Sequence, residues 1–228
     1  MKVQIVKMAT IFTIMLIGCG QEKKEEPVTL KATKSMNPKV QEELAVISTQ
    51  FGDMVVEFYE DVAPMHVESF KALADEGYFD KTTFHRVIPG FVIQGGDPNS
   101  KDENRMNDGT GGRAGKFFGI GREDDPSTWT IPAEFNDKDH VKGTLSMARS
   151  KDPNSGSSQF FVCHASTPQL NNQYTVFGQV IQGLEVIDQI VYSDTPRKQN
   201  PGYRGPDGDN PLEKVEMEVR LVNRSDID

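Results

Sequence analysis

The chain has 228 residues, of which 36% are hydrophobic and 13 are phenylalanine, which is enough apolar material for a sizeable core. Its 34 acidic residues outnumber the 25 basic ones, and the formal net charge is −9. Because negative charge repels a phosphate backbone, this balance argues against a nucleic-acid partner.

The amino terminus has the pattern of a signal peptide. Two lysines precede an apolar run over residues 8–17, which is shorter than the ~20 residues that a membrane-spanning helix needs. The run ends at Gly18 and Cys19, and this ending resembles the lipobox of bacterial lipoproteins. The resemblance implies cleavage of residues 1–18 and acylation of Cys19. An ordinary signal peptide that contains a cysteine by chance is the alternative.

Residues 19–42 are predicted to be a lipidated, flexible tether, because a charged stretch followed by scattered Pro and Lys has too little apolar content to pack. The lipobox resemblance implies a location in the bacterial cell envelope, with the protein held to a membrane through Cys19. The other cysteine, Cys163, lies in an apolar run and is expected to be a buried, inert thiol, so no disulfide is expected.

A folded domain is predicted over residues 43–224. A period of two over 54–59 predicts a strand, and Pro64 begins a helix whose apolar residues keep helical spacing until Gly77. Further strands are expected at 84–88, 91–94, 131–135, 143–148, 159–163, 174–181 and 215–222, with a second helix over 184–191. Many short strands with two helices predict an all-β barrel or sandwich. Residues 100–130 form a long loop, a length that is usually functional or mobile.

Several short motifs suggest other functions, but their neighbouring residues do not fit those functions. The G-x-G-x-x-A pattern at 109–114 follows no apolar strand, so it has no scaffold for a dinucleotide. A calcium loop is excluded because Lys101 occupies a ligand position. The histidines have no metal-ligand spacing, and His85 is interpreted as a hydrogen-bonded structural ring. No metal or cofactor is predicted.

One arginine stands in an apolar, strand-forming run over residues 84–96. Strand alternation allows Arg86, Phe91 and Gln94 to share one surface. A guanidinium that stays protonated, beside an aromatic ring and an amide, suits binding of a neutral peptide carbonyl better than proton transfer.

Four sequence blocks occur in the order found in one family. They are Phe84 to Asp97, Gly109 to Gly112, Gly143 to Arg149, and Ser158 to Val162, followed by Val176-Phe177-Gly178. In these blocks the chain resembles the cyclophilins, which are peptidyl-prolyl cis-trans isomerases, over roughly residues 44–222. The resemblance implies a closed eight-stranded antiparallel barrel capped by two α-helices. It also implies proline-containing polypeptides as substrates, and we expect a monomer.

The resemblance also assigns site residues. Arg86 is expected to be the donor to the imide nitrogen, with its fork held by Gln94. The proline pocket and the surface that grips the substrate chain are expected to comprise Phe91, Val92, Ala148, Arg149, Gln159, Phe161, Leu170 and Tyr174.

Three positions depart from the usual cyclophilin pattern. Gln169 stands where many members have a tryptophan, so weak cyclosporin binding is expected, and the only tryptophan, Trp129, lies in the long loop. Arg149 replaces an asparagine, and Tyr174 stands where histidine is common. Two other functions stay open: an envelope peptide-binding or chaperone module with incidental turnover, and an interaction module that uses the 100–130 loop.

Overall fold

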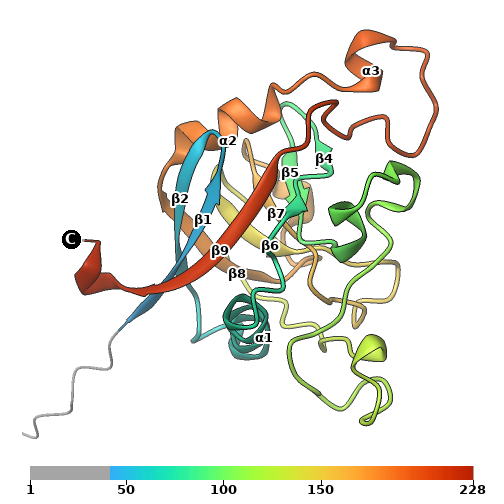
Figure 1. The fold of residues 1–228 in the computed structure, drawn as a ribbon. Coiled ribbons are helices and arrows are strands. Elements are labelled where there is room, and N and C mark those ends of the chain that lie inside the picture. The colour runs from blue at the N-terminus through green and yellow to red at the C-terminus, as the bar shows by residue number, and fades with distance from the viewer. Residues whose placement is uncertain (1–41, 228) are drawn as a thin grey trace, which may run out of the picture. The chain divides into compact units, whose positions relative to one another are not determined.

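The computed structural model describes residues 42–227 (Figure 1), so the predicted signal peptide, Cys19 and nearly all of the predicted tether lie outside the described residues. Nine strands form one antiparallel sheet in this part of the chain, in the order β3-β9-β1-β2-β8-β6-β7-β5-β4. The strands are β1 (Glu43–Thr49), β2 (Gly52–Phe58), β3 (Thr82–Thr83), β4 (Arg86–Val87), β5 (Val92–Gly95), β6 (Thr144–Met147), β7 (Phe160–Cys163), β8 (Val176–Gln182) and β9 (Glu216–Asn223).

The two strands at the edges of the sheet are consecutive in the chain. The expected strand over 84–88 is interrupted, and only Arg86 and Val87 of it form β4. On one side the Phe84 amide donates to the Val215 carbonyl at 2.9 Å, and on the other the Val87 amide donates to the Asp209 carbonyl at 2.9 Å. The structure therefore shows a curled sheet of nine strands within residues 42–227, which corrects the predicted closed barrel of eight.

The strand expected at 131–135 is also wrong. Ile131 forms one isolated bridge with Gly156. The next backbone donors bind side chains instead of a neighbouring strand, because the Ala133 amide donates to Asn154 and the Glu134 amide donates to Thr175, both at 3.0 Å. Conversely, the sequence reading missed strand β1, which pairs with both β2 and β9.

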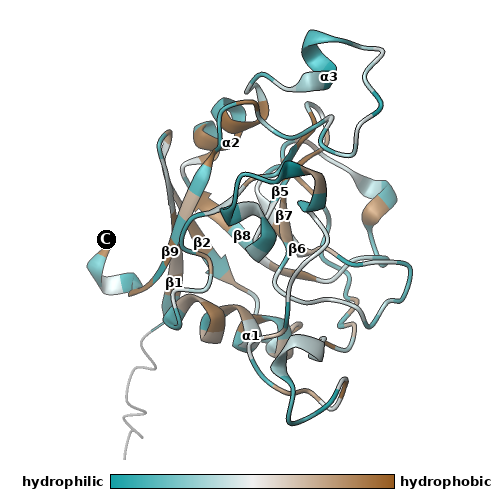
Figure 2. Ribbon diagram, turned by 45° about the vertical axis from the view of Figure 1, so that its right-hand side comes forward, coloured by the Kyte–Doolittle hydropathy of each residue, from teal (hydrophilic) through white to brown (hydrophobic). Residues whose placement is uncertain are grey.

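Two helices match the predictions, α1 (Pro64–Asp75) and α2 (Leu184–Val191), and they lie at opposite ends of the curled sheet (Figure 1). A third, α3 (Pro196–Gln199), is a single short turn. Hydrophobic and hydrophilic residues alternate along the turns of α1 (Figure 2), and Phe70 on its buried face packs against Phe79 and Phe160 at centroid distances of 4.8 and 5.5 Å. Aromatic contacts of this kind join the helix to the sheet.

The first turn of α1 is capped from a distant part of the chain. The carboxylate of Glu134 accepts hydrogen bonds from the Met65 and His66 amides at 3.1 and 2.9 Å, and from Nδ1 of His66 at 2.6 Å. These bonds satisfy amide groups that a helix leaves unpaired at its start. Within residues 42–227, no helix has both the length and the apolar character needed to cross a membrane.

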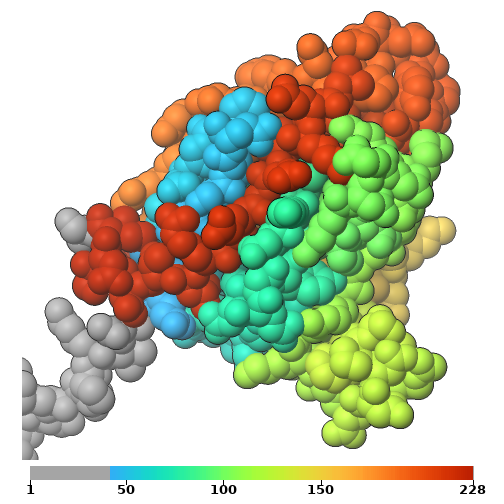
Figure 3. Space-filling model, viewed as in Figure 1, coloured from blue at the N-terminus to red at the C-terminus, as the bar shows by residue number. Residues whose placement is uncertain are grey.

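The long loop predicted over 100–130 contains no strand or α-helix among the described residues. Its first part packs against the segment that precedes β9, and the two surfaces adjoin in Figure 3. The side chain of Asn210 donates to Asp108 at 2.6 Å, and Arg105 donates to the Leu212 carbonyl at 2.9 Å. These contacts hold the loop beside the edge of the sheet that carries Arg86.

Candidate functional site

Strands β4, β5 and β7 place the predicted polar and apolar residues on one face. In the strand register Arg86 is paired with Gln94, and Gln94 is paired with Phe161. Directly paired residues in a sheet project to the same side, so these side chains form a row across three strands. Phe91, just before β5, lies below the guanidinium, with its ring centroid 5.7 Å from Cζ of Arg86.

A chain of hydrogen bonds fixes the arginine. Nη1 of Arg86 donates to Oε1 of Gln94 at 3.2 Å, Nε2 of Gln94 donates to Oε1 of Gln159 at 3.0 Å, and Nε2 of Gln159 donates to the Gly111 carbonyl at 2.7 Å. Each amide thus accepts from one neighbour and donates to the next, which sets its orientation. Burial lowers the pKa of the Arg86 guanidinium, and the charge of Asp209 opposes this shift only in part. Because an arginine side chain stays protonated at ordinary pH, Arg86 is charged.

The row lines a cavity of about 130 Å³. Its walls are Arg86, Phe91, Val92, Gln94, Ala148, Arg149, Phe161, Leu170 and Tyr174. Of the residues that sequence reasoning assigned to the site within the folded domain, Gln159 alone is absent from this wall, and it lies directly behind, bonded to Gln94. The cavity is small, and its walls combine apolar side chains with the guanidinium groups of Arg86 and Arg149, so it suits a compact hydrocarbon ring next to a carbonyl group.

The floor of the cavity rests on a residue that sequence reasoning did not single out. The ring of His140 stacks on Phe161, with centroids 5.9 Å apart and an interplanar angle of 19°. His140 is buried, its Nε2 lies 3.0 Å from the Ser146 hydroxyl, and its Nδ1 lies 3.0 Å from Oδ1 of Asn171. Burial lowers its pKa. His140 lies 21 residues before Phe161 in the sequence, so no local sequence pattern predicts this contact. The two rings meet only in the folded structure.

His85, beside the key arginine, is a buried ring, as predicted, but it is not hydrogen-bonded as predicted. Neither ring nitrogen has a hydrogen-bond partner among the described residues. Burial lowers its pKa to about 4, with Asp97 opposing the shift, so the ring is neutral near pH 7. It therefore contributes bulk next to Arg86 and no charge.

A groove of about 310 Å³ adjoins the cavity and shares Gln94, Ala148 and Arg149 with it. Its other walls are Gly109, Thr110, Gly111, Gly112, Thr130, Ser150, Ser155, Ser157 and Gln159. Part of the long loop therefore borders the site. The motifs of the sequence gave no indication that the hydroxyl groups of residues 150–157 belong to this surface.

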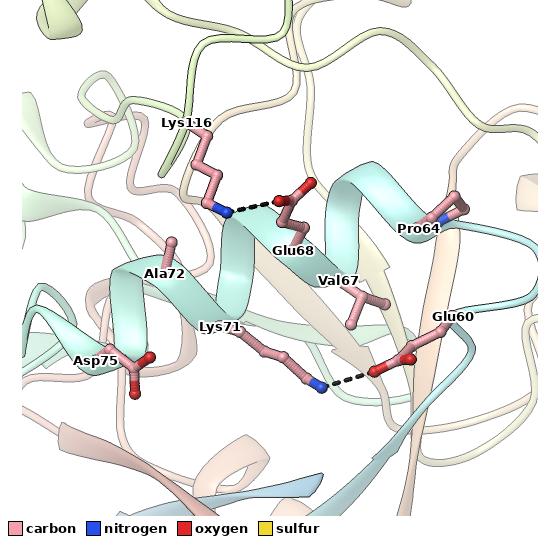
Figure 4. Close-up of a pocket in the computed structure, with 8 residues that line it drawn as sticks. All are labelled: Glu60, Pro64, Val67, Glu68, Lys71, Ala72, Asp75 and Lys116. Carbon is pink, nitrogen blue, oxygen red and sulfur yellow. Dashed lines mark hydrogen bonds and ion pairs between the residues drawn. The ribbon is translucent and has the colours of Figure 1, made fainter. Parts of the chain in front are cut away.

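A larger hollow of about 470 Å³ lies beside α1 (Figure 4) but has the wrong chemistry. Both of its lysines pair with glutamates of the same hollow: Lys71 with Glu60 at 2.6 Å and Lys116 with Glu68 at 2.5 Å. Its walls contain no aromatic ring, and its cations are already paired, so it is not the functional site. Within residues 42–227, no cluster of His, Cys, Asp and Glu side chains could hold a metal ion.

Comparison with known proteins places this geometry in one family. Residues 44–217 match the profile described as "Cyclophilin type peptidyl-prolyl cis-trans isomerase/CLD". A Brucella abortus protein named "Probable peptidyl-prolyl cis-trans isomerase" is 34% identical over 79% of this chain and 86% of its own length. A Synechococcus elongatus peptidyl-prolyl cis-trans isomerase is 41% identical over 66% of this chain and 90% of its own.

Among solved structures, a cyclophilin type peptidyl-prolyl cis-trans isomerase of Cryptosporidium parvum, crystallised in the presence of the dipeptide Ala-Pro, is similar at a TM-score of 0.63 and 29% identity. The match covers 79% of this chain and 98% of that one.

Proposed function

This chain belongs to the cyclophilin-type peptidyl-prolyl cis-trans isomerases and catalyses rotation about X-Pro bonds, and we propose that Arg86 is the donor that drives the reaction. Amide resonance holds the rotation barrier at about 18–20 kcal/mol. Rotation breaks this resonance and returns a lone pair to the imide nitrogen. A donor aimed at that lone pair stabilises the twisted state more than either planar state, which is what catalysis requires.

The observation that carries this proposal is the hydrogen-bonded row from Arg86 through Gln94 to Gln159 at the rim of the cavity. A proline ring in the cavity would contact Phe161 and Leu170, and its imide nitrogen would lie toward the guanidinium. The arginine needs no reorganisation when the bond twists, and such preorganisation is the main source of electrostatic catalysis.

Exchange spectroscopy on a peptide with one Ala-Pro bond tests the activity without a coupled protease. Without a catalyst, cis-trans isomerisation takes tens to hundreds of seconds. The protein should make the exchange much faster than this uncatalysed rate. A protein that only binds peptides would shift the peptide resonances without changing the exchange rate. That second result would favour the chaperone module.

We also propose that Cys19 anchors the enzyme to a membrane of the bacterial cell envelope, where exported polypeptides are its substrates. The support is the order of basic residues, an apolar run and Gly18-Cys19. Each buried methylene of an acyl chain contributes about 0.8 kcal/mol, so a multiply acylated cysteine would hold the protein firmly. The segment 19–42 would then act as a tether for the catalytic domain.

Fractionation and mass spectrometry test the anchor. Cys19→Ser should release the protein from the membrane fraction and abolish acylation, whereas Cys163→Ser, which changes the buried cysteine, should leave both unchanged. An unmodified amino terminus on wild-type protein in the soluble fraction would contradict the anchor and leave a secreted isomerase.

A further inference from the structure

The surface that receives the substrate has a charge opposite to that of the whole protein. Its two cations are Arg86 in the cavity and Arg149 at the boundary with the groove. Among the described residues, no Asp or Glu lines either hollow, although the chain has a net charge of −9. Asp97 lies beneath the groove, but it is fully buried and accepts hydrogen bonds from the Asn99 and Gly111 amides.

Arg149 is held in one position by the surrounding backbone. Its Nε and Nη2 donate to the Gln173 carbonyl at 3.0 and 2.7 Å, and its Nη1 donates to the Ser150 carbonyl at 2.9 Å. Its Cζ lies 4.5 Å from the ring centroid of Tyr174. These bonds use three of the five N–H groups of a guanidinium and leave two for a ligand. Because the side chain is already fixed, little conformational entropy is lost when a ligand binds.

The groove next to this cation has slightly more polar than apolar surface. Glycines of the loop 109–112 form one side, and the hydroxyl groups belong to Thr110, Thr130, Ser150, Ser155 and Ser157. Thr110 and Ser155 already donate to backbone carbonyls at 2.6 Å and Ser150 donates to Ser155 at 2.8 Å, so among the described residues the hydroxyl groups of Thr130 and Ser157 are left to donate to a ligand beside Arg149. A carboxylate accepts hydrogen bonds from hydroxyl and guanidinium groups alike, whereas an ammonium group would find no carboxylate on these walls.

We propose that the groove is a subsite for an acidic side chain near the substrate proline, and that Arg149 is the residue that selects it. An extended peptide with its proline in the cavity reaches the groove within a few residues, because a strand advances about 3.3 Å per residue. The inference rests on the isomerase function, and it assigns this enzyme a preference for polypeptides with Asp or Glu close to proline.

Exchange spectroscopy on matched peptides provides the test. Glu, Gln or Lys is placed in turn at each of the three positions before the proline and at the one after it, and kcat/KM is measured for each peptide. At one position we expect Glu to exceed Gln by about two- to fivefold and Lys to be disfavoured, which is the range for a solvent-exposed charged contact. This preference should shrink when ionic strength rises from ~20 mM to ~500 mM.

Two variants identify the selecting residue. Arg149→Gln should bring the Glu-to-Gln ratio close to one, and taking the ratio cancels any general loss of activity. Arg149→Lys keeps the positive charge but loses the planar set of guanidinium N–H donors, so it should keep part of the preference for Glu over Gln. The matched control is Lys151→Gln, which removes an equal charge from an exposed residue two positions away and should leave the ratio unchanged.

Equal rates for Glu and Gln peptides at every position, or a preference that persists in Arg149→Gln, would overturn the inference while leaving the isomerase function intact. An absence of acceleration for every peptide would instead contradict the isomerase function itself. Circular dichroism of Arg149→Gln establishes that the variant is folded before its ratio is interpreted.

Discussion

Replacing Arg86 by alanine removes the guanidinium that we propose donates to the imide nitrogen. A hydrogen bond from a charged donor contributes about 1.5–3 kcal/mol. Because each 1.36 kcal/mol is a factor of ten in rate, kcat/KM should fall by on the order of 10²-fold. If the bond forms chiefly in the twisted state, the loss should occur in kcat, with a smaller change in KM.

The hydrogen-bonded row makes a second, sharper expectation possible. Gln94 positions Arg86 through the 3.2 Å bond, so Gln94→Ala alone should also slow the reaction. In the Arg86→Ala background the same change should cost little, because there is no guanidinium left to position. This non-additivity in a double-mutant cycle separates a positioning role from a structural one.

Exchange spectroscopy on an Ala-Pro peptide measures the rates, and circular dichroism shows that each variant is folded. Arg220→Ala is the matched control, because Arg220 is an exposed arginine on β9 that pairs with Asp53. A folded Arg86→Ala variant with a rate within about twofold of wild type would refute the assignment of the donor.

Three further expectations follow from single side chains. Cyclosporin should inhibit the wild-type enzyme weakly, and Gln169→Trp should tighten inhibition; strong inhibition of the wild type would contradict this. Burial alone would raise the pKa of Glu134, but hydrogen bonds from His66 outweigh it and hold that pKa below its ordinary value. The carboxylate therefore stabilises the fold above its unfolded-state pKa and loses this contribution as the pH falls through the folded value. The melting-temperature deficit of Glu134→Gln should be largest near pH ~7 and shrink toward pH ~3, and a pH-independent deficit would contradict the reasoning. Burial raises the pKa of the Cys163 thiol to about 11, so a thiol reagent at pH ~8 should modify this residue in unfolded protein and not in native protein.

Local patterns in the sequence were sufficient for most of the fold. The helical spacing after Pro64 and the alternation over 54–59 depend on neighbouring residues, and α1 and β2 match both. The errors occur where backbone groups bind distant partners. Residues 131–135 were predicted to form a strand, but the backbone amides of residues 133 and 134 donate to the side chains of Asn154 and Thr175. No local pattern in the sequence shows that these distant side chains replace a neighbouring strand as hydrogen-bond acceptors.

The residues of the candidate site also divide into those that lie close together in the sequence and those that only the fold brings together. Arg86 and Gln94 lie only eight residues apart, so the sequence predicted that they share one surface, but the structure brings them together by pairing β4 with β5 and not by alternation along one strand. His140 reaches the floor of the cavity only because the strand carrying Phe161 folds back over it. Its function depends on packing between separate segments, which sequence spacing does not encode.

The pairing of the first described strand with the last has a consequence for the timing of synthesis. Glu43 of β1 is aligned with Asn223 of β9, and β9 also holds β3, the strand that precedes Arg86 in the chain (Figure 1). A chain that emerges from its amino terminus cannot complete this sheet until nearly all of it is available. Non-local pairing of this kind also slows folding. A partly synthesised chain would therefore lack a finished cavity, and the enzyme would become active only after nearly all of its residues have left the ribosome.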